Sequence, residues 1–140
     1  MKKEIHYFFS ALMFYTRIPC PKWVDHSDEN LNKSRKYFPL IGWIVGTISA
    51  LCVFLLHPIL PLSVSILFSI AISIYITGAF HEDGFADTCD GFGGGWTKEQ
   101  ILAIMKDSRI GTYGTVGILL ILAIKFSILY EIGTFSLPLL

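Results

Sequence analysis

Four carboxylates crowd into nine residues beside a long apolar stretch: Glu82, Asp83, Asp87 and Asp90. If this segment is helical, Asp83, Asp87 and Asp90 stand at i, i+4 and i+7 and share one face. Neighbouring like charges destabilise a helix, so the pattern favours a site where a hard divalent cation neutralises them. Mg²⁺, which prefers a few carboxylate oxygens together with substrate phosphates, is the cofactor we expect. The alternative is a solvated acidic helix end that binds nothing.

A second polar segment follows at residues 106–114. We expect Asp107 to complete the metal site, and Lys106 and Arg109 to hold a diphosphate through charge-assisted hydrogen bonds. Ser108 either contacts the substrate or caps a helix. Anchoring of a helix end by positive charges is the alternative reading of this segment.

Two side chains beside the carboxylates are candidates for accepting a proton during catalysis, His81 and Glu82. The other histidines lie far from the acidic cluster in the sequence.

A glycine-rich stretch, residues 91–95, separates the two polar segments and reads as a flexible loop. The backbone N–H groups of Gly93 and Gly94 could approach a phosphate, although a plain linker is equally consistent with the composition. Thr97 is placed to cap a short helix that runs to about Met105.

The elements that position these residues are membrane helices. The chain has 140 residues, of which 53% are hydrophobic and 16% charged, and residues 37–80 contain no Asp, Glu, Lys or Arg. A formal net charge of zero argues against nucleic acid as a partner, and the aromatic content argues against disorder. The fold class predicted is an all-α, polytopic transmembrane helix bundle in contact with the lipid bilayer.

About 20 apolar residues span a bilayer as a helix. Residues 38–56 and 62–80 meet this length and are joined by a short turn, which predicts an antiparallel hairpin. A third span is predicted at about 112–130. Gly42 and Gly46 have a spacing that allows close helix packing.

The N-terminal segment precedes these spans. Residues 5–15 predict an aromatic-rich interfacial helix, ended by Pro19 and Pro21, and a cleaved signal peptide is the weaker reading. Residues 22–36 predict a polar linker. The three cysteines, odd in number and without C-x-x-C spacing, predict neither a disulfide framework nor a zinc site.

Basic residues determine the predicted orientation. They gather before the first span and in residues 81–111, and the turn at 57–61 has none. The positive-inside rule therefore predicts an inner-membrane protein whose N-terminus and residues 81–111 lie on the cytoplasmic side. We expect a single membrane domain over 1–140: an N-terminal segment (1–36), a hairpin (37–80), an active-site segment (81–111) and a third span (112–130).

Two long motifs resemble the cobalamin synthase family, also called adenosylcobinamide-GDP ribazoletransferase. They run from His81 to Gly91 and from Met105 to Gly114, and residues 14–19 and 37–42 look like the same family. Members are usually longer, so the chain resembles their N-terminal portion.

The resemblance implies a Mg²⁺-dependent membrane transferase in a late step of cobalamin biosynthesis. It would join adenosylcobinamide-GDP to α-ribazole or its 5′-phosphate, giving adenosylcobalamin or its phosphate and GMP. Other cobalamin-assembly enzymes are possible partners.

Three alternatives stay open from the sequence. Asp87-x-x-Asp90-Gly91 is similar to the opening of the CDP-alcohol phosphotransferase signature, but the Ala-Arg that follows there is absent. A cation transporter would carry acidic residues within a span, whereas these lie at its end. A small structural membrane subunit would not need the carboxylates.

Overall fold

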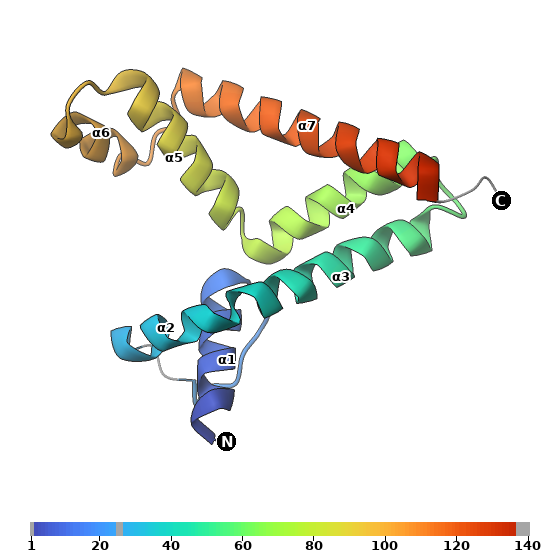
Figure 1. Ribbon diagram of the computed structural model, residues 1–140, viewed down its shortest axis with the longest axis horizontal. Helices are drawn as coiled ribbons and strands as arrows, with labels where there is room; N and C mark the ends of the chain where they lie inside the picture. Colours follow the sequence, from blue (N-terminus) through green and yellow to red (C-terminus); the bar gives the residue numbers. More distant parts are fainter. Residues whose placement is uncertain (1, 25–26, 137–140) are drawn as a thin grey trace. The chain divides into compact units, whose positions relative to one another are not determined.

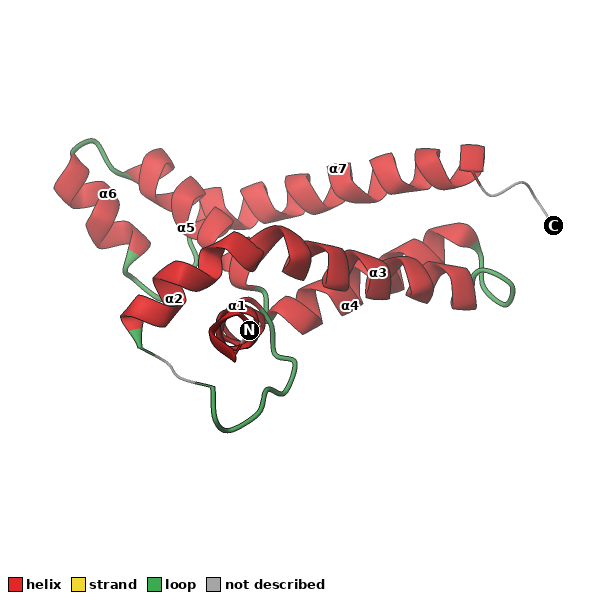
Figure 2. Ribbon diagram, turned by 60° about the horizontal axis from the view of Figure 1, so that its bottom comes forward, coloured by secondary structure: helices red, strands yellow, loops and turns green. Residues whose placement is uncertain are grey.

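The computed structural model describes residues 2–24 and 27–136, and within these ranges it contains helices and no strand (Figures 1 and 2). The chain divides into two compact units, Met1–Gly78 and Ala79–Leu140. The first unit contains α1 (Lys2–Tyr15), α2 (Asp28–Ser34), the 3₁₀ helix η1 (Arg35–Tyr37), α3 (Phe38–Leu56) and α4 (Leu62–Thr77). The second contains α5 (Phe80–Gly94), α6 (Lys98–Met105) and α7 (Thr112–Ser136). The predicted all-α fold is confirmed.

Among the residues that the structure describes, two helices are long and apolar enough to cross a membrane. They are α7 and the continuous helical stretch that ends in α3, and a third candidate arises if α4 and α5 count as one broken span. The helix at 38–56 has the predicted bounds. Helix α7 continues beyond the predicted end of the third span near residue 130 and runs to Ser136, and the exposed Glu131 does not interrupt it.

The hairpin is confirmed, since α3 and α4 lie side by side and are joined by the turn after Leu56 (Figure 1). The prediction that the second helix continues to Phe80 is wrong. Helix α4 ends at Thr77, because Gly78 and Ala79 have φ values of 66° and 60°. Such left-handed residues terminate a helix, although the apolar character of the sequence continues through them.

The prediction of a polar linker at 22–36 is wrong for its second half, which is helical. Helix α2 and η1 continue without a break into α3. Pro39 explains the 3₁₀ turn at this junction. It has no N–H to donate to the carbonyl of Arg35, and the N–H of Phe38 donates to that carbonyl instead.

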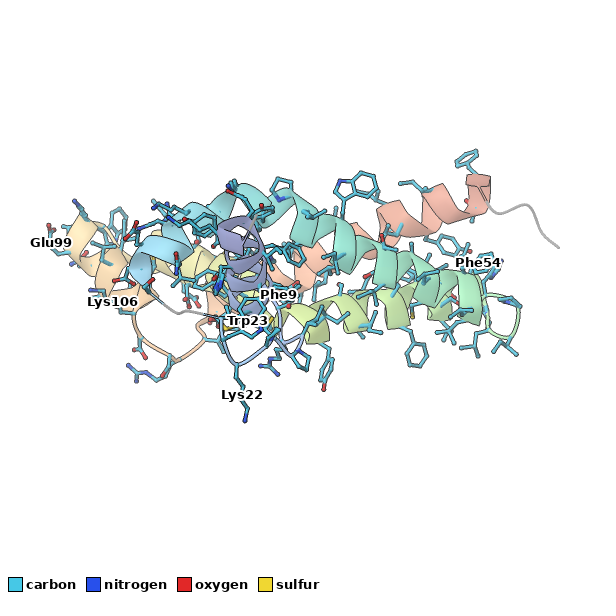
Figure 3. All side chains as sticks on the ribbon, turned by 90° about the horizontal axis from the view of Figure 1, so that it is seen from below. Phe9, Lys22, Trp23, Phe54, Glu99 and Lys106 are labelled. Atoms are coloured by element: carbon cyan, nitrogen blue, oxygen red, sulfur yellow. The ribbon has the colours of Figure 1, made fainter. Side chains whose placement is uncertain are left out.

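Helix α1, predicted from the aromatic run, packs against the start of α3. The core of this contact contains Ala11, Leu12 and Ile41. Glu4 accepts hydrogen bonds from Lys36 (2.6 Å) and Tyr37 (2.7 Å). The ring of Phe9 contacts that of Trp23 at a centroid distance of 5.4 Å, and both side chains are labelled in Figure 3.

Helix α1 ends before the prolines that were expected to end it. The buried Thr16 donates its hydroxyl hydrogen to the carbonyl of Leu12 and accepts the N–H of Ile18. Between these two residues, the N–H of Arg17 donates to the carbonyl of Ile76 at 2.7 Å. This hydrogen bond joins the turn after α1 to the end of α4.

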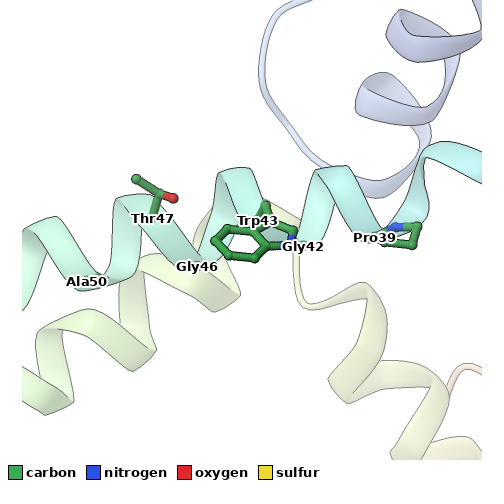
Figure 4. A pocket seen from close by; sticks show the side chains of 6 residues that line it. All are labelled: Pro39, Gly42, Trp43, Gly46, Thr47 and Ala50. Atoms are coloured by element: carbon green, nitrogen blue, oxygen red, sulfur yellow. The ribbon is translucent and has the colours of Figure 1, made fainter.

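Within the described part of the first unit, no helix packs against the glycine pair on α3. A Cβ built on Gly42 or Gly46 would have no atom within 4 Å. Both residues line an open groove of about 530 Å³ beside Trp43 and Thr47 (Figure 4). The packing expected from their spacing is therefore not used among the described helices of the first unit.

Candidate active site

The acidic segment is helical, as its spacing requires. Helix α5 runs without interruption through Asp83, Asp87 and Asp90, so their Cα–Cβ bonds project within about 60° of one another. Their environments differ along this face. Asp83 is exposed, Asp87 is half-buried, and Asp90 is only 8% exposed.

Both carboxylate oxygens of Asp90 accept backbone hydrogen bonds from the start of α7. The N–H of Gly111 donates to Oδ2 at 2.7 Å and the N–H of Gly114 donates to Oδ1 at 2.8 Å. A carboxylate at a helix N-terminus also interacts favourably with the helix dipole. Asp90 therefore joins α5 to α7 in this structure, which was not foreseen.

Glycines let α7 approach α5 closely. A Cβ on Gly114 would lie 2.9 Å from the carbonyl oxygen of Ala86, and one on Gly117 would lie 2.7 Å from Sγ of Cys89. These separations are shorter than real Cβ contacts, so the absence of side chains on this face of α7 permits the packing. The recurrence of glycine every three residues from Gly111 was the sequence signal for it.

The glycine-rich stretch is not a flexible loop, and that prediction is wrong. Gly93 and Gly94 belong to the last turn of α5, and Gly95 closes it by donating its N–H to the carbonyl of Gly91 at 2.9 Å. A Cβ on Gly91 would lie 2.7 Å from Cγ of Met105, so this glycine allows α6 to pack on α5.

Gly93 has a similar packing role, because a Cβ there would meet the ring of Tyr113. Phosphate binding by Gly93 and Gly94 stays a prediction, now without the loop that suggested it.

Helix α6 has the predicted N-cap. The Thr97 hydroxyl accepts the N–H of Gln100, and the Gln100 side chain accepts the N–H of Thr97, which forms a capping box. The helix ends at Met105, as expected.

The segment after α6 contains a local ion pair. The guanidinium of Arg109 donates to both oxygens of Asp107, with Nη2 to Oδ2 at 2.6 Å and Nε to Oδ1 at 3.1 Å. These side-chain hydrogen bonds, followed by the one from the Arg109 backbone N–H, lower the pKa of Asp107 below its ordinary value. The Arg109 side chain is 87% exposed, and Lys106 and Ser108 are exposed as well.

The two predicted proton acceptors sit in the first turn of α5. His81 is exposed, and its ring contacts that of Phe80. Glu82 is half-buried, and its Oε2 is buried without a hydrogen-bond partner among the described residues. A buried acceptor left without a donor costs free energy.

The four predicted metal ligands are not gathered into one cluster. Within the described chain, no group of three or more His, Cys, Asp or Glu side chains is arranged to hold a metal ion. Asp107 is paired with Arg109, and Asp90 is turned to α7. Asp83 and Asp87 remain one helical turn apart on α5. Two carboxylates suit Mg²⁺, which usually takes one or two and completes its shell with water and substrate phosphate.

Comparison with known proteins identifies the family. Residues 7–140 match the family described as cobalamin-5-phosphate synthase. The chain is 50% identical over 134 residues to the adenosylcobinamide-GDP ribazoletransferase of Shewanella oneidensis, covering 96% of this chain and 51% of the relative. The protein of the same name from Shewanella frigidimarina is 48% identical with the same coverage.

The chain thus spans about half the length of the curated relatives it matches. No solved structure matches it. On the family match over nearly its whole length, this chain belongs to the cobalamin-5-phosphate synthase family.

Proposed function

We propose that the protein catalyses the transfer named for its relatives, joining adenosylcobinamide-GDP to α-ribazole or α-ribazole 5′-phosphate with release of GMP. The proposal is supported by the family match and the shared name of the relatives. The observation that carries it is the acidic face of α5. Asp83 and Asp87 lie one turn apart there, and Asp83 is preceded in the sequence by Glu82, whose Oε2 accepts no hydrogen bond in the described chain.

Asp83 and Asp87 are the residues that would hold Mg²⁺ in this proposal. When bound, Mg²⁺ would neutralise negative charge on the diphosphate and on the departing GMP. Their oxygens supply the hard ligands that this ion prefers.

The reaction requires one proton acceptor and side chains that bind the phosphates. A hydroxyl of the ribazole attacks the phosphorus that carries cobinamide, and the bond from this phosphorus to the bridging oxygen of GMP breaks. Glu82, whose Oε2 has no donor in the described chain, would accept the hydroxyl proton, and His81 is the second candidate. Lys106 and Arg109, both exposed, would bind the phosphates, with Ser108 as a further donor.

We propose further that the protein lies in the cytoplasmic membrane with residues 81–111 facing the cytoplasm. The basic residues that precede α3 and the uncharged turn at 57–61 support this orientation. It would give the water-soluble nucleotide substrate access to α5.

A transfer assay tests the function. Membranes containing the chain, beside membranes containing the full-length Shewanella oneidensis relative, are supplied with adenosylcobinamide-GDP, α-ribazole and Mg²⁺, and GMP is measured. We expect GMP release that requires both α-ribazole and Mg²⁺, and its loss in Asp87→Asn. Glu99→Gln, which removes an exposed carboxylate from α6 (Figure 3), is the matched control and should retain activity.

Retained activity in Asp87→Asn of the relative, at its equivalent position, would contradict the assignment of α5. Activity in the relative with none in the chain itself would show that the second half of the relatives is needed.

A further inference from the structure

The start of α7 is capped by a residue from another helix. Its N-cap is Gly111, whose carbonyl accepts the N–H of Thr115, and its third position is Gly114. In a capping box, side chains at these two positions accept each other's N–H groups. Glycine has no side chain, so α7 cannot form a capping box of its own, whereas α6 does so with Thr97 and Gln100.

Asp90 supplies what the two glycines lack. One oxygen accepts the N–H of Gly111 and the other accepts the N–H of Gly114, so a single carboxylate from α5 satisfies both of the groups that a capping box would satisfy. The three residues form a set, which we call the cross-helix cap.

The cross-helix cap encloses the carboxylate. A Cβ on Gly111 would lie 2.9 Å from Cγ of Asp90, and one on Gly114 would lie 3.0 Å from the same atom. Asp90 is 8% exposed. Mg²⁺ usually keeps several of its water molecules, and an enclosed carboxylate that already accepts two N–H groups is poorly suited to a hydrated ion.

We propose that Asp90 is a positioning residue and not a metal ligand. It holds Gly111 against α5 and thereby limits where residues 106–110, which connect α6 to this point, can lie. Loss of the cap would therefore free the segment that carries Lys106 and Arg109. This inference rests on the proposed function for its effect on substrate binding, but the cap itself is independent of activity.

Two substitutions, Gly111→Ser and Asp90→Ala, test the cross-helix cap, because the effect of the first on stability should change sign when the second is present. Gly111→Ser in the native background should lower stability, because the new Cβ meets Asp90. In the Asp90→Ala background the same change should raise stability, because that space is vacated and serine is a favoured N-cap. Gly111 does not have a positive φ, so serine is compatible with its backbone.

Hydrogen exchange and thermal unfolding of the chain in detergent provide the readouts. Asp90→Ala should speed exchange at the amides of Gly111 and Gly114 by about tenfold or more, the scale of a lost hydrogen bond to a charged group. Asp87→Asn should leave both amides unchanged. Unchanged exchange in Asp90→Ala, or the same sign for Gly111→Ser in both backgrounds, would overturn the cross-helix cap.

The role in substrate binding is tested in the transfer assay. Asp90→Asn should raise the KM for adenosylcobinamide-GDP by about tenfold and leave the Mg²⁺ concentration for half-maximal activity unchanged, since no metal ligand is lost. A rise of tenfold or more in the Mg²⁺ requirement would identify Asp90 as a ligand and overturn the assignment. Absence of GMP release from every form of the protein would refute the proposed function, while the exchange experiment would still decide the cap.

Discussion

Replacing Gly114 by alanine should separate α7 from α5. The added Cβ would lie 2.9 Å from the carbonyl oxygen of Ala86 and 3.0 Å from Cγ of Asp90. The first of these atoms is backbone and cannot rotate away. The helices must therefore shift, and the 2.8 Å hydrogen bond from the Gly114 N–H to Asp90 must lengthen.

Three contributions determine how much Gly114→Ala changes the free energy of unfolding: two destabilise the fold and one stabilises it. Overpacking costs about 1–3 kcal/mol, and weakening a hydrogen bond to a buried carboxylate costs about 1.5–3 kcal/mol. Alanine in place of glycine within a helix contributes about 0.5–1 kcal/mol in the opposite direction. We therefore expect Gly114→Ala to lower the free energy of unfolding by about 1.5–5.5 kcal/mol.

Gly84→Ala is the matched control, because a Cβ on this glycine of α5 has no atom within 4 Å. It should be neutral or stabilise the chain by about 0.5–1 kcal/mol through helix propensity alone. Unfolding of both variants in detergent, followed by circular dichroism, gives the comparison. Equal stability of Gly114→Ala and Gly84→Ala would refute the close packing of α7 on α5.

Three further outcomes are expected. Thr97→Ala removes the acceptor of the Gln100 N–H and should cost about 1 kcal/mol in the same unfolding experiment, whereas Thr97→Ser should cost much less. Arg109→Gln removes the hydrogen bonds that lower the pKa of Asp107, so the carboxyl resonance of Asp107 should titrate at higher pH, and an unshifted titration would contradict the pairing. Because the native pKa is depressed, the stabilisation from this pair is present above the ordinary aspartate pKa and is lost as pH falls through the lowered value. Gly78→Ala forces a side chain onto a residue with φ of 66° and should cost about 1–2 kcal/mol in unfolding, a result that an equally stable variant would exclude.

Much of the helical architecture could be predicted because it depends on local sequence. Residues 38–56 form a helix with the expected bounds, and Thr97 caps α6 as its position suggests. The end of α4 could not be predicted from hydropathy, since the apolar run continues through the positive-φ Ala79. The helical state of Gly93 and Gly94 was missed for a related reason. Their low helix propensity is outweighed by packing of neighbouring helices against this end of α5.

The candidate site also contains one feature that the sequence predicts and one that it does not. The shared helical face of Asp83, Asp87 and Asp90 followed from spacing alone. The partners of Asp90 did not, because Gly111 and Gly114 lie 21 and 24 residues further along the chain. Without the tertiary fold, a carboxylate that caps a distant helix has the same sequence signature as one that binds a metal ion.

Binding of Mn²⁺, a paramagnetic substitute for Mg²⁺, tests the assignment of the acidic face most directly. Titration of the chain with Mn²⁺ in the presence of adenosylcobinamide-GDP, followed by electron paramagnetic resonance, measures the ion that remains free. The assignment predicts bound Mn²⁺ in the native protein and in Asp90→Asn, and a loss of binding of about tenfold or more in Asp87→Asn. Loss of binding in Asp90→Asn with retention in Asp87→Asn would contradict it.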